Sequence, residues 1–293
     1  CILAWMDRFR DYGAEHLTMK LGFSSNAFKR FSLEQCIPLI SQIGYSGIEI
    51  LCDVPHAYPP KDLDVNKIRA LLSKHNLEIS NLNSFTLYAI KDTYHPSWIE
   101  DTSDLRHMRF EHTKNCIELA SKLGCRIVST EGGGPLPKKS YHSVLRSRFK
   151  KEMNALSQFA EDQGVKVLVE PEPGLLLENS QDFLSFIKSI QSEYIRLNFD
   201  IAHFYCARED PAEVVHRLSD FIEHFHISDI ATSRIHNHLI PGEGSIDFKS
   251  VFRAIVEFGY KGFVTVELYP YQNNPVFAGA KAFEFLRRLI LEL

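Results

Sequence analysis

The chain has 293 residues, of which 44% are hydrophobic and 24% charged, a balance typical of a globular protein. Its 33 basic and 37 acidic side chains give a net charge of −4, and no long run of lysine or arginine indicates a nucleic-acid-binding face. No apolar stretch reaches the length of a membrane span, and residues 1–18 lack the apolar core of a signal peptide. We therefore expect a cytoplasmic protein without nucleic-acid or membrane partners.

Strand-like and helix-like segments alternate along the chain. Short aliphatic runs predict strands at residues 20–23, 47–51, 79–82, 126–129, 166–169, 195–199, 222–227 and 262–266. Helical patterns fill the intervals, over residues 33–43, 65–75, 105–123, 144–163, 181–190, 211–218, 248–258 and 275–291. Ser180 is the expected N-cap of the sixth helix, and Gly44 and Gly124 are expected helix stops.

Eight strand–helix units predict a (β/α)8 TIM barrel, an α/β fold, in one domain over residues 19–293. Residues 1–18 are then an N-terminal extension of unknown role. The alternative, an open doubly wound sheet, would carry a glycine-rich turn after the first strand. That position holds Ser24-Ser-Asn-Ala-Phe, without glycine, which favours the barrel.

Four side chains able to bind a metal follow four successive strands in the C-terminal half. They are Glu170, Asp200, His226 and Glu267, at intervals of 30, 26 and 41 residues. Because the carboxyl ends of barrel strands meet at one rim, we expect these groups to converge. Singly, Asp200 fits a helix cap and His226 a buried core histidine. Together they predict a divalent cation, since unpaired carboxylates repel one another and resist desolvation.

Several motifs around these positions carry a family resemblance. They are Val169-Glu170-Pro, Asp200-Ile-Ala-His203, His226-Ile-Ser-Asp229, the segment 238–248 and Val266-Glu267. Over residues 20–293 the chain resembles the sugar phosphate isomerase/epimerase family of xylose isomerase-like TIM barrels, a group that includes ketose 3-epimerases, inosose dehydratases and endonuclease IV. The resemblance implies that Glu170, Asp200, His226 and Glu267 hold one divalent metal ion and that His203 faces the substrate. The expected ion is Mn²⁺, with Mg²⁺, Co²⁺ or Zn²⁺ as alternatives.

The resemblance also implies a reaction. Glu170 and Glu267 would act as the acid/base pair from opposite faces of the substrate, and His203 would bind a hydroxyl or carry a proton. We expect isomerisation or epimerisation of a sugar, sugar phosphate or cyclitol by proton transfer through a metal-bound enediolate. A hydride shift of the xylose isomerase type relies on a second metal and a lysine, and no lysine lies beside the four motifs.

Further residues are candidates for binding the substrate. They are His56, Glu172, Arg234 and His238, all in segments that follow predicted strands. The sequence leaves open whether the protein forms a homo-oligomer.

Three other functions remain as alternatives. A lyase that dehydrates a keto-cyclitol would share the proton-removal step and the metal. A phosphodiesterase of the endonuclease IV type would need additional histidine ligands from the early units and an Asp-x-His pair after the seventh strand, where this chain has His236-Asn-His238. A non-catalytic sugar-binding barrel would not need the intact set of four metal-binding side chains.

Overall fold

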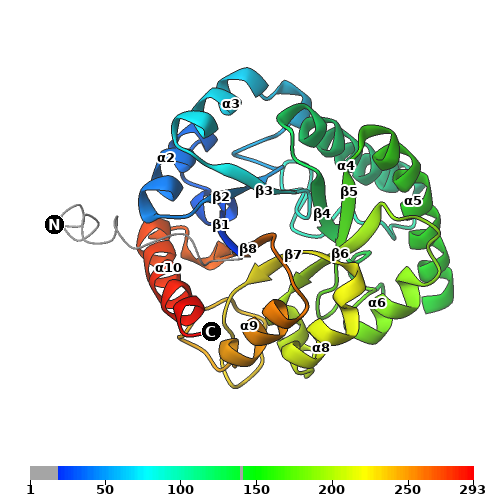
Figure 1. Ribbon diagram of the computed structural model, residues 1–293. Helices are drawn as coiled ribbons and strands as arrows, with labels where there is room; N and C mark the ends of the chain where they lie inside the picture. Colours follow the sequence, from blue (N-terminus) through cyan, green and yellow to red (C-terminus); the bar gives the residue numbers. More distant parts are fainter. Residues whose placement is uncertain (1–18, 139–140) are drawn as a thin grey trace.

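The computed structural model describes residues 19–138 and 141–293, so the extension expected over residues 1–18 lies outside the described residues. Eight parallel strands pair in chain order and close into a barrel, with the first strand bonded to the last (Figure 1). The strands are β1 (Lys20–Ser24), β2 (Gly47–Leu51), β3 (Glu78–Asn83), β4 (Ile127–Glu131), β5 (Lys166–Glu170), β6 (Ile195–Asp200), β7 (Ile222–Ile227) and β8 (Phe263–Val266). The predicted barrel is confirmed, and each strand end lies within two residues of its expected position.

Helices surround the strands as an outer ring (Figure 1). They are α2 (Leu33–Ile43), α3 (Val65–Lys74), α4 (Ser103–Leu123), α5 (His142–Gln163), α6 (Ser180–Ile187), α8 (Pro211–Leu218), α9 (Phe248–Glu257) and α10 (Pro275–Leu291). A further short helix, α7 (Ile201–Cys206), was not expected from the sequence. The cap of α6 was also predicted wrongly, because Asn179 accepts the hydrogen bond from the Asp182 amide and Ser180 is already helical. Over the part of the chain that is described, no helix is long and apolar enough to span a membrane.

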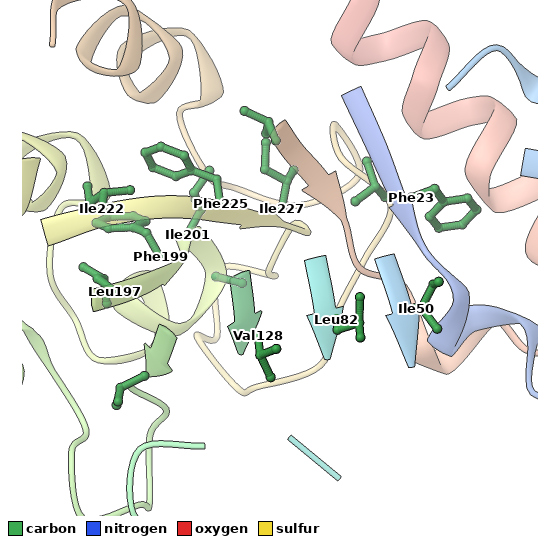
Figure 2. Packing of buried hydrophobic residues seen from close by; sticks show 14 of the residues in the cluster. Phe23, Ile50, Leu82, Val128, Leu197, Phe199, Ile201, Ile222, Phe225 and Ile227 are labelled. Carbon is green, nitrogen blue, oxygen red and sulfur yellow. The ribbon is translucent and has the colours of Figure 1, made fainter. Parts of the chain in front are cut away.

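The hydrophobic core lies between the strands and the helices. Side chains alternate along a strand, so every second residue points outward to the helices. Phe199 of β6 and Phe225 of β7 pack there with ring centroids 5.2 Å apart (Figure 2). Both rings are fully buried, and burial of one such ring contributes about 1.5–3 kcal/mol. This layer fixes the strands as a rigid support for the groups at their ends.

The inside of the barrel is polar. His226 of β7 hydrogen-bonds Glu49 of β2, and Thr265 of β8 donates to Ser80 of β3, although neither pair of strands is adjacent. Such bonds can only cross the interior. The space is also tight: a Cβ atom on Gly22 of β1 would lie 2.7 Å from Thr265 Oγ1. The barrel is therefore held from outside by apolar packing and from inside by hydrogen bonds.

Candidate metal centre and pocket

The structure brings together the four candidate metal ligands Glu170, Asp200, His226 and Glu267 at the carboxyl ends of β5 to β8, a cluster that we call the carboxylate centre. Glu170 and Asp200 end β5 and β6, His226 is the penultimate residue of β7, and Glu267 follows β8 directly. One ligand atom from each residue lies within 4.8 Å of all the others. All four side chains are buried. The convergence follows from strand order, because neighbouring parallel strands end at the same rim.

Two amide side chains orient the two glutamates. Asn26 Nδ2 donates to Glu267 Oε1 and Asn198 Nδ2 donates to Glu170 Oε2, each at 2.7 Å. Each carboxylate therefore keeps one oxygen turned toward the common centre. Glu170 Oε1 lies 3.3 Å from His226 Nδ1, and Glu267 Oε2 lies 3.9 Å from the same nitrogen.

A buried carboxylate holds the far side of the histidine ring. His226 Nε2 lies 2.5 Å from Glu49 Oε2, which leaves Nδ1 toward the centre. Glu49 also accepts hydrogen bonds from Ser24, Asn81 and Asn83. Burial alone would raise the pKa of Glu49, but the charge and hydrogen bond of His226 lower it to about 2. A carboxylate behind a ligating imidazole is a common device for fixing its tautomer and orientation.

Sequence reasoning missed these supporting groups. One signal for Glu49 was present in the sequence: it is the single acidic residue in the otherwise apolar run Gly47-Ile-Glu-Ile-Leu, which forms the buried strand β2. Nothing local to the sequence could show that its partner lies on the opposite strand. Asn26 and Asn198 gave no signal that separates them from ordinary polar residues of loops and strands.

Asp200 and Glu267 show that the carboxylate centre carries uncompensated negative charge. Asp200 Oδ1 caps α7 by accepting from the Ala202 and His203 amides, while Oδ2 is buried with no hydrogen-bond partner. Burial and repulsion from Glu170 and Asp200 raise the pKa of Glu267 to about 8, against the attraction of His226. An unpartnered buried oxygen and repelling carboxylates are the features that a divalent cation would relieve. The residues present therefore fit such an ion.

A pocket with a volume of about 160 Å³ opens above this centre. Polar and aromatic side chains line it, including Glu170, Glu172, His203, His238, Glu267, Phe85, Tyr88, Tyr94 and Tyr269. Such aromatic rings can pack against the apolar C–H faces of a small polar molecule, and the carboxylates and imidazoles can form hydrogen bonds with it.

His203 of α7 lies at the edge of the pocket. Its Nδ1 is 3.0 Å from the Pro171 carbonyl oxygen, so this nitrogen carries a proton and the ring is fixed. Burial would lower the pKa of His203, but the nearby Asp200, Glu172 and Glu170 carboxylates raise it to about 9. The ring lines the pocket, and its substrate-facing role stays a prediction.

Glu172 and His238, two expected substrate-binding residues, also line the pocket but already have protein partners. Glu172 Oε1 accepts the Tyr94 hydroxyl at 2.6 Å and lies 3.2 Å from His236 Nδ1. His238 Nδ1 lies 3.0 Å from the Glu267 carbonyl oxygen.

His56 and Arg234 do not line this pocket, and their expected role in binding the substrate stays a prediction. His56 Nε2 lies 3.3 Å from the Phe28 carbonyl oxygen and 3.6 Å from Cys36 Sγ, and burial lowers the pKa of this histidine to about 4. Arg234 donates to the Tyr205 carbonyl at 3.0 Å, and its guanidinium lies 4.1 Å from the centre of that ring. Both side chains are therefore engaged with other segments of the chain, His56 with Phe28 and Cys36 and Arg234 with Tyr205.

The fold and the polar rim define a (β/α)8 barrel of the kind that carries its chemistry at the carboxyl ends of the strands. The family model described as "Xylose isomerase-like TIM barrel" matches residues 37–289. The chain belongs to this family.

Several relatives of the chain are named as epimerases or dehydratases. It is 27% identical over 283 residues to a fructoselysine 3-epimerase of Shigella flexneri, covering 94% of this chain and 99% of that protein. It is 23% identical over 287 residues to an inosose dehydratase of Clostridium beijerinckii, covering 88% and 90% of the two chains. Among solved structures, a D-tagatose 3-epimerase-like protein superposes with a TM-score of 0.79 at 25% identity, over 93% of this chain and 97% of that one.

Proposed function

We propose that this protein is a divalent-metal-dependent isomerase or epimerase of a small sugar, sugar phosphate or cyclitol that acts by proton transfer. The observation that carries the proposal is the convergence of Glu170, Asp200, His226 and Glu267 beneath a pocket of small-molecule size. The relatives named as fructoselysine 3-epimerase and D-tagatose 3-epimerase-like protein support this reaction class.

The four converging side chains would hold the metal ion. Three carboxylates and one imidazole suit Mn²⁺, our first choice, and also Mg²⁺, Co²⁺ or Zn²⁺. When bound, such an ion supplies Lewis-acid polarisation of a substrate carbonyl, which acidifies the neighbouring C–H bond. Its charge would also relieve the repulsion that raises the pKa of Glu267.

Proton transfer is assigned to the two glutamates. Glu170 and Glu267 each have one oxygen anchored by an amide, and both side chains line the pocket. A carboxylate at this position can take a proton from carbon and return it. His203 would then fix a substrate oxygen, since its Nδ1 is already held by the main chain.

Dehydration of a keto-cyclitol is a second candidate, because the inosose dehydratase matches over most of both chains. Both reactions begin with removal of a proton beside a carbonyl. The two reactions differ only after this step. In epimerisation or isomerisation a proton returns to carbon, whereas in dehydration a hydroxyl group leaves.

Solvent isotope incorporation tests the proposal. The Mn²⁺-loaded protein is incubated in deuterated water with a panel of 2-ketohexoses and an inosose, and products are examined by NMR and mass spectrometry. Epimerisation or isomerisation by proton transfer predicts one solvent deuterium at the carbon that changes. Loss of water with formation of an unsaturated ketone would favour the dehydratase.

The control is Glu267→Gln, which should show neither exchange nor turnover. Turnover with complete retention of the substrate hydrogen at every stage of the reaction would contradict proton transfer with solvent exchange. Absence of both turnover and exchange on every substrate of the panel would favour a sugar-binding role.

A further inference from the structure

The pocket above the carboxylate centre has a positively charged side chain in its wall. Lys29 directly follows the short 3₁₀ helix η3 (Ser25–Phe28), which comes after β1. In the described part of the chain, it is the one lysine or arginine among the pocket-lining residues. Its side chain is partly buried, and its Nζ lies 4.4 Å from the centre of the Tyr88 ring. The proton transfer proposed above does not use this charge.

The charge of Lys29 is not neutralised by an acidic side chain. Among residues 19–138 and 141–293, no carboxylate oxygen lies within 4.0 Å of its Nζ. Two pocket histidines differ in this respect, because His203 Nε2 lies 3.7 Å from Asp200 Oδ2 and His236 Nδ1 lies 3.2 Å from Glu172 Oε1. The ammonium group of Lys29 is therefore available to a negatively charged group on the molecule that fills the pocket.

Two loops hold this ammonium group in place. On one side, Phe28 directly before Lys29 is fully buried, which fixes the main chain there. On the other side, Asp53 accepts hydrogen bonds from the Tyr88 amide at 2.6 Å and from the Ala89 amide at 3.0 Å. The Tyr88 ring is thereby held against the ammonium group, which its π-electrons attract. Such preorganisation lowers the entropic cost of binding a charged ligand.

The same turn connects Lys29 with the carboxylate centre. Asn26, three residues earlier, donates to Glu267 Oε1 and also lines the pocket. Residues three apart in a 3₁₀ helix lie on the same face, roughly 6 Å from each other along its axis. A small sugar whose carbonyl group lies at the carboxylate centre can therefore extend its other end toward Lys29.

The charges along the pocket set the direction in which an anionic sugar would bind. The carboxylate centre contributes three carboxylates, from Glu170, Asp200 and Glu267, so a bound divalent ion would still leave one negative charge among them. A phosphate or carboxylate group is repelled from that end of the pocket and attracted to Lys29. The uncharged carbonyl end of the same molecule then faces the carboxylate centre.

We propose that Lys29 binds an anionic group, a phosphate or a carboxylate, at the end of the sugar away from its carbonyl, and so selects anionic over neutral sugars. The inference rests on the proposed function, because it places the sugar carbonyl at the carboxylate centre. A lysine ammonium acts as a point charge that accepts either anion. A hydrogen bond between charged groups increases affinity roughly 10- to 100-fold.

Calorimetric titration of the Mn²⁺-loaded protein tests the inference by binding, independently of turnover. The probes are D-fructose, D-fructose 6-phosphate and D-fructuronate, which differ in the group at carbon 6. We expect the wild type to bind at least one of the two anionic sugars about 10-fold or more tightly than D-fructose. A preference for one of them alone would identify the phosphate or the carboxylate as the group that Lys29 selects.

Three variants assign the preference to Lys29. Lys29→Met removes the charge at similar length and should abolish the preference, whereas Lys29→Arg should retain it. The matched control is Lys74→Met, which removes an exposed lysine at the end of α3 and should bind as the wild type does.

Two results would overturn the inference: wild-type protein that binds neither anionic sugar more tightly than D-fructose, or a preference that persists in Lys29→Met. The proposed function is judged separately by solvent isotope incorporation. A preference for anionic sugars without isotope exchange on any of them would retain the role of Lys29 and contradict proton transfer. Exchange on D-fructose without such a preference would do the reverse.

Discussion

The two halves of the barrel contribute differently to the rim. Strands β5 to β8 and their ends supply all four members of the carboxylate centre, whereas β1 to β3 supply Ser24, Glu49, Asn81 and Asn83, which hydrogen-bond one another's side chains or His226. The C-terminal half therefore presents free lone pairs, and the N-terminal half orients the groups that carry them.

The pKa values of two buried glutamates, one from each half of the barrel, illustrate this difference. Glu49 has a pKa of about 2 and Glu267 a pKa of about 8, although burial raises the pKa of both. Glu49 faces His226 at 2.5 Å and accepts three further hydrogen bonds, while Glu267 faces Glu170 and Asp200. The partners, more than the burial, decide which carboxylate stays charged and which is available for a metal ion or a proton.

The largest effects are expected in the C-terminal half. Glu170→Gln and Glu267→Gln should each lower kcat by about 10³-fold or more, because each loses a metal-binding oxygen and an acid/base group together. The double variant should be little worse than either single one, since the residues act as a unit. Steady-state rates on a responsive sugar, with metal content measured in parallel, check this.

The control is Glu78→Gln, which alters an exposed glutamate of β3 paired with Lys20. It should keep wild-type activity. Near-normal turnover by either pocket variant would remove that carboxylate from the mechanism and would weaken the contrast between the two halves.

A smaller effect is expected from the supporting side of the barrel. Glu49→Gln should lower the affinity of the carboxylate centre for Mn²⁺ by roughly 10- to 100-fold, because His226 loses the carboxylate that fixes its ring. Calorimetric titration of the metal-free protein measures this, with Glu78→Gln again as the control. An unchanged Kd for Mn²⁺ would show that Glu49 stabilises the barrel interior and does not contribute to metal binding.

The smallest effect concerns Glu131, the last residue of β4. Both of its carboxylate oxygens are buried without a hydrogen-bond partner, and Arg109 Nε lies 3.8 Å away. Burial, with a contribution from Glu172, raises the pKa of Glu131 to about 8 despite the attraction of Arg109. The folded protein then holds a proton that the unfolded chain releases.

The raised pKa of Glu131 should contribute fully to the stability of the folded protein below about pH 4.5, and this contribution should be lost as the pH rises through about 8. Glu131→Gln, which cannot titrate, should have a free energy of unfolding that falls less between pH 5 and 8.5 than that of the wild type. Urea unfolding of the metal-free proteins at several pH values measures the difference. Parallel curves for variant and wild type would mean that Glu131 is already ionised at pH 5.

The amino-acid sequence by itself determined the barrel and the place of the carboxylate centre. Eight alternating strand and helix patterns, with helix stops such as Gly44 and Gly124, define the repeat, and the last four strands end in Glu170, Asp200, His226 and Glu267. These features are local, and parallel strands in a closed barrel necessarily end at one rim, so the spacing was enough to predict the convergence.

Only the tertiary structure decided which other side chains reach the rim. Glu49 and His226 are 177 residues apart in the sequence but hydrogen-bond across the barrel. Closure of the sheet brings them together, and no local sequence pattern indicates it. The conformation of the loop around Asp229 brings His236 and His238 to His203 and leaves Arg234 on Tyr205. Loop side chains are placed by such long-range hydrogen bonds and packing, which residue type and position after a strand do not encode.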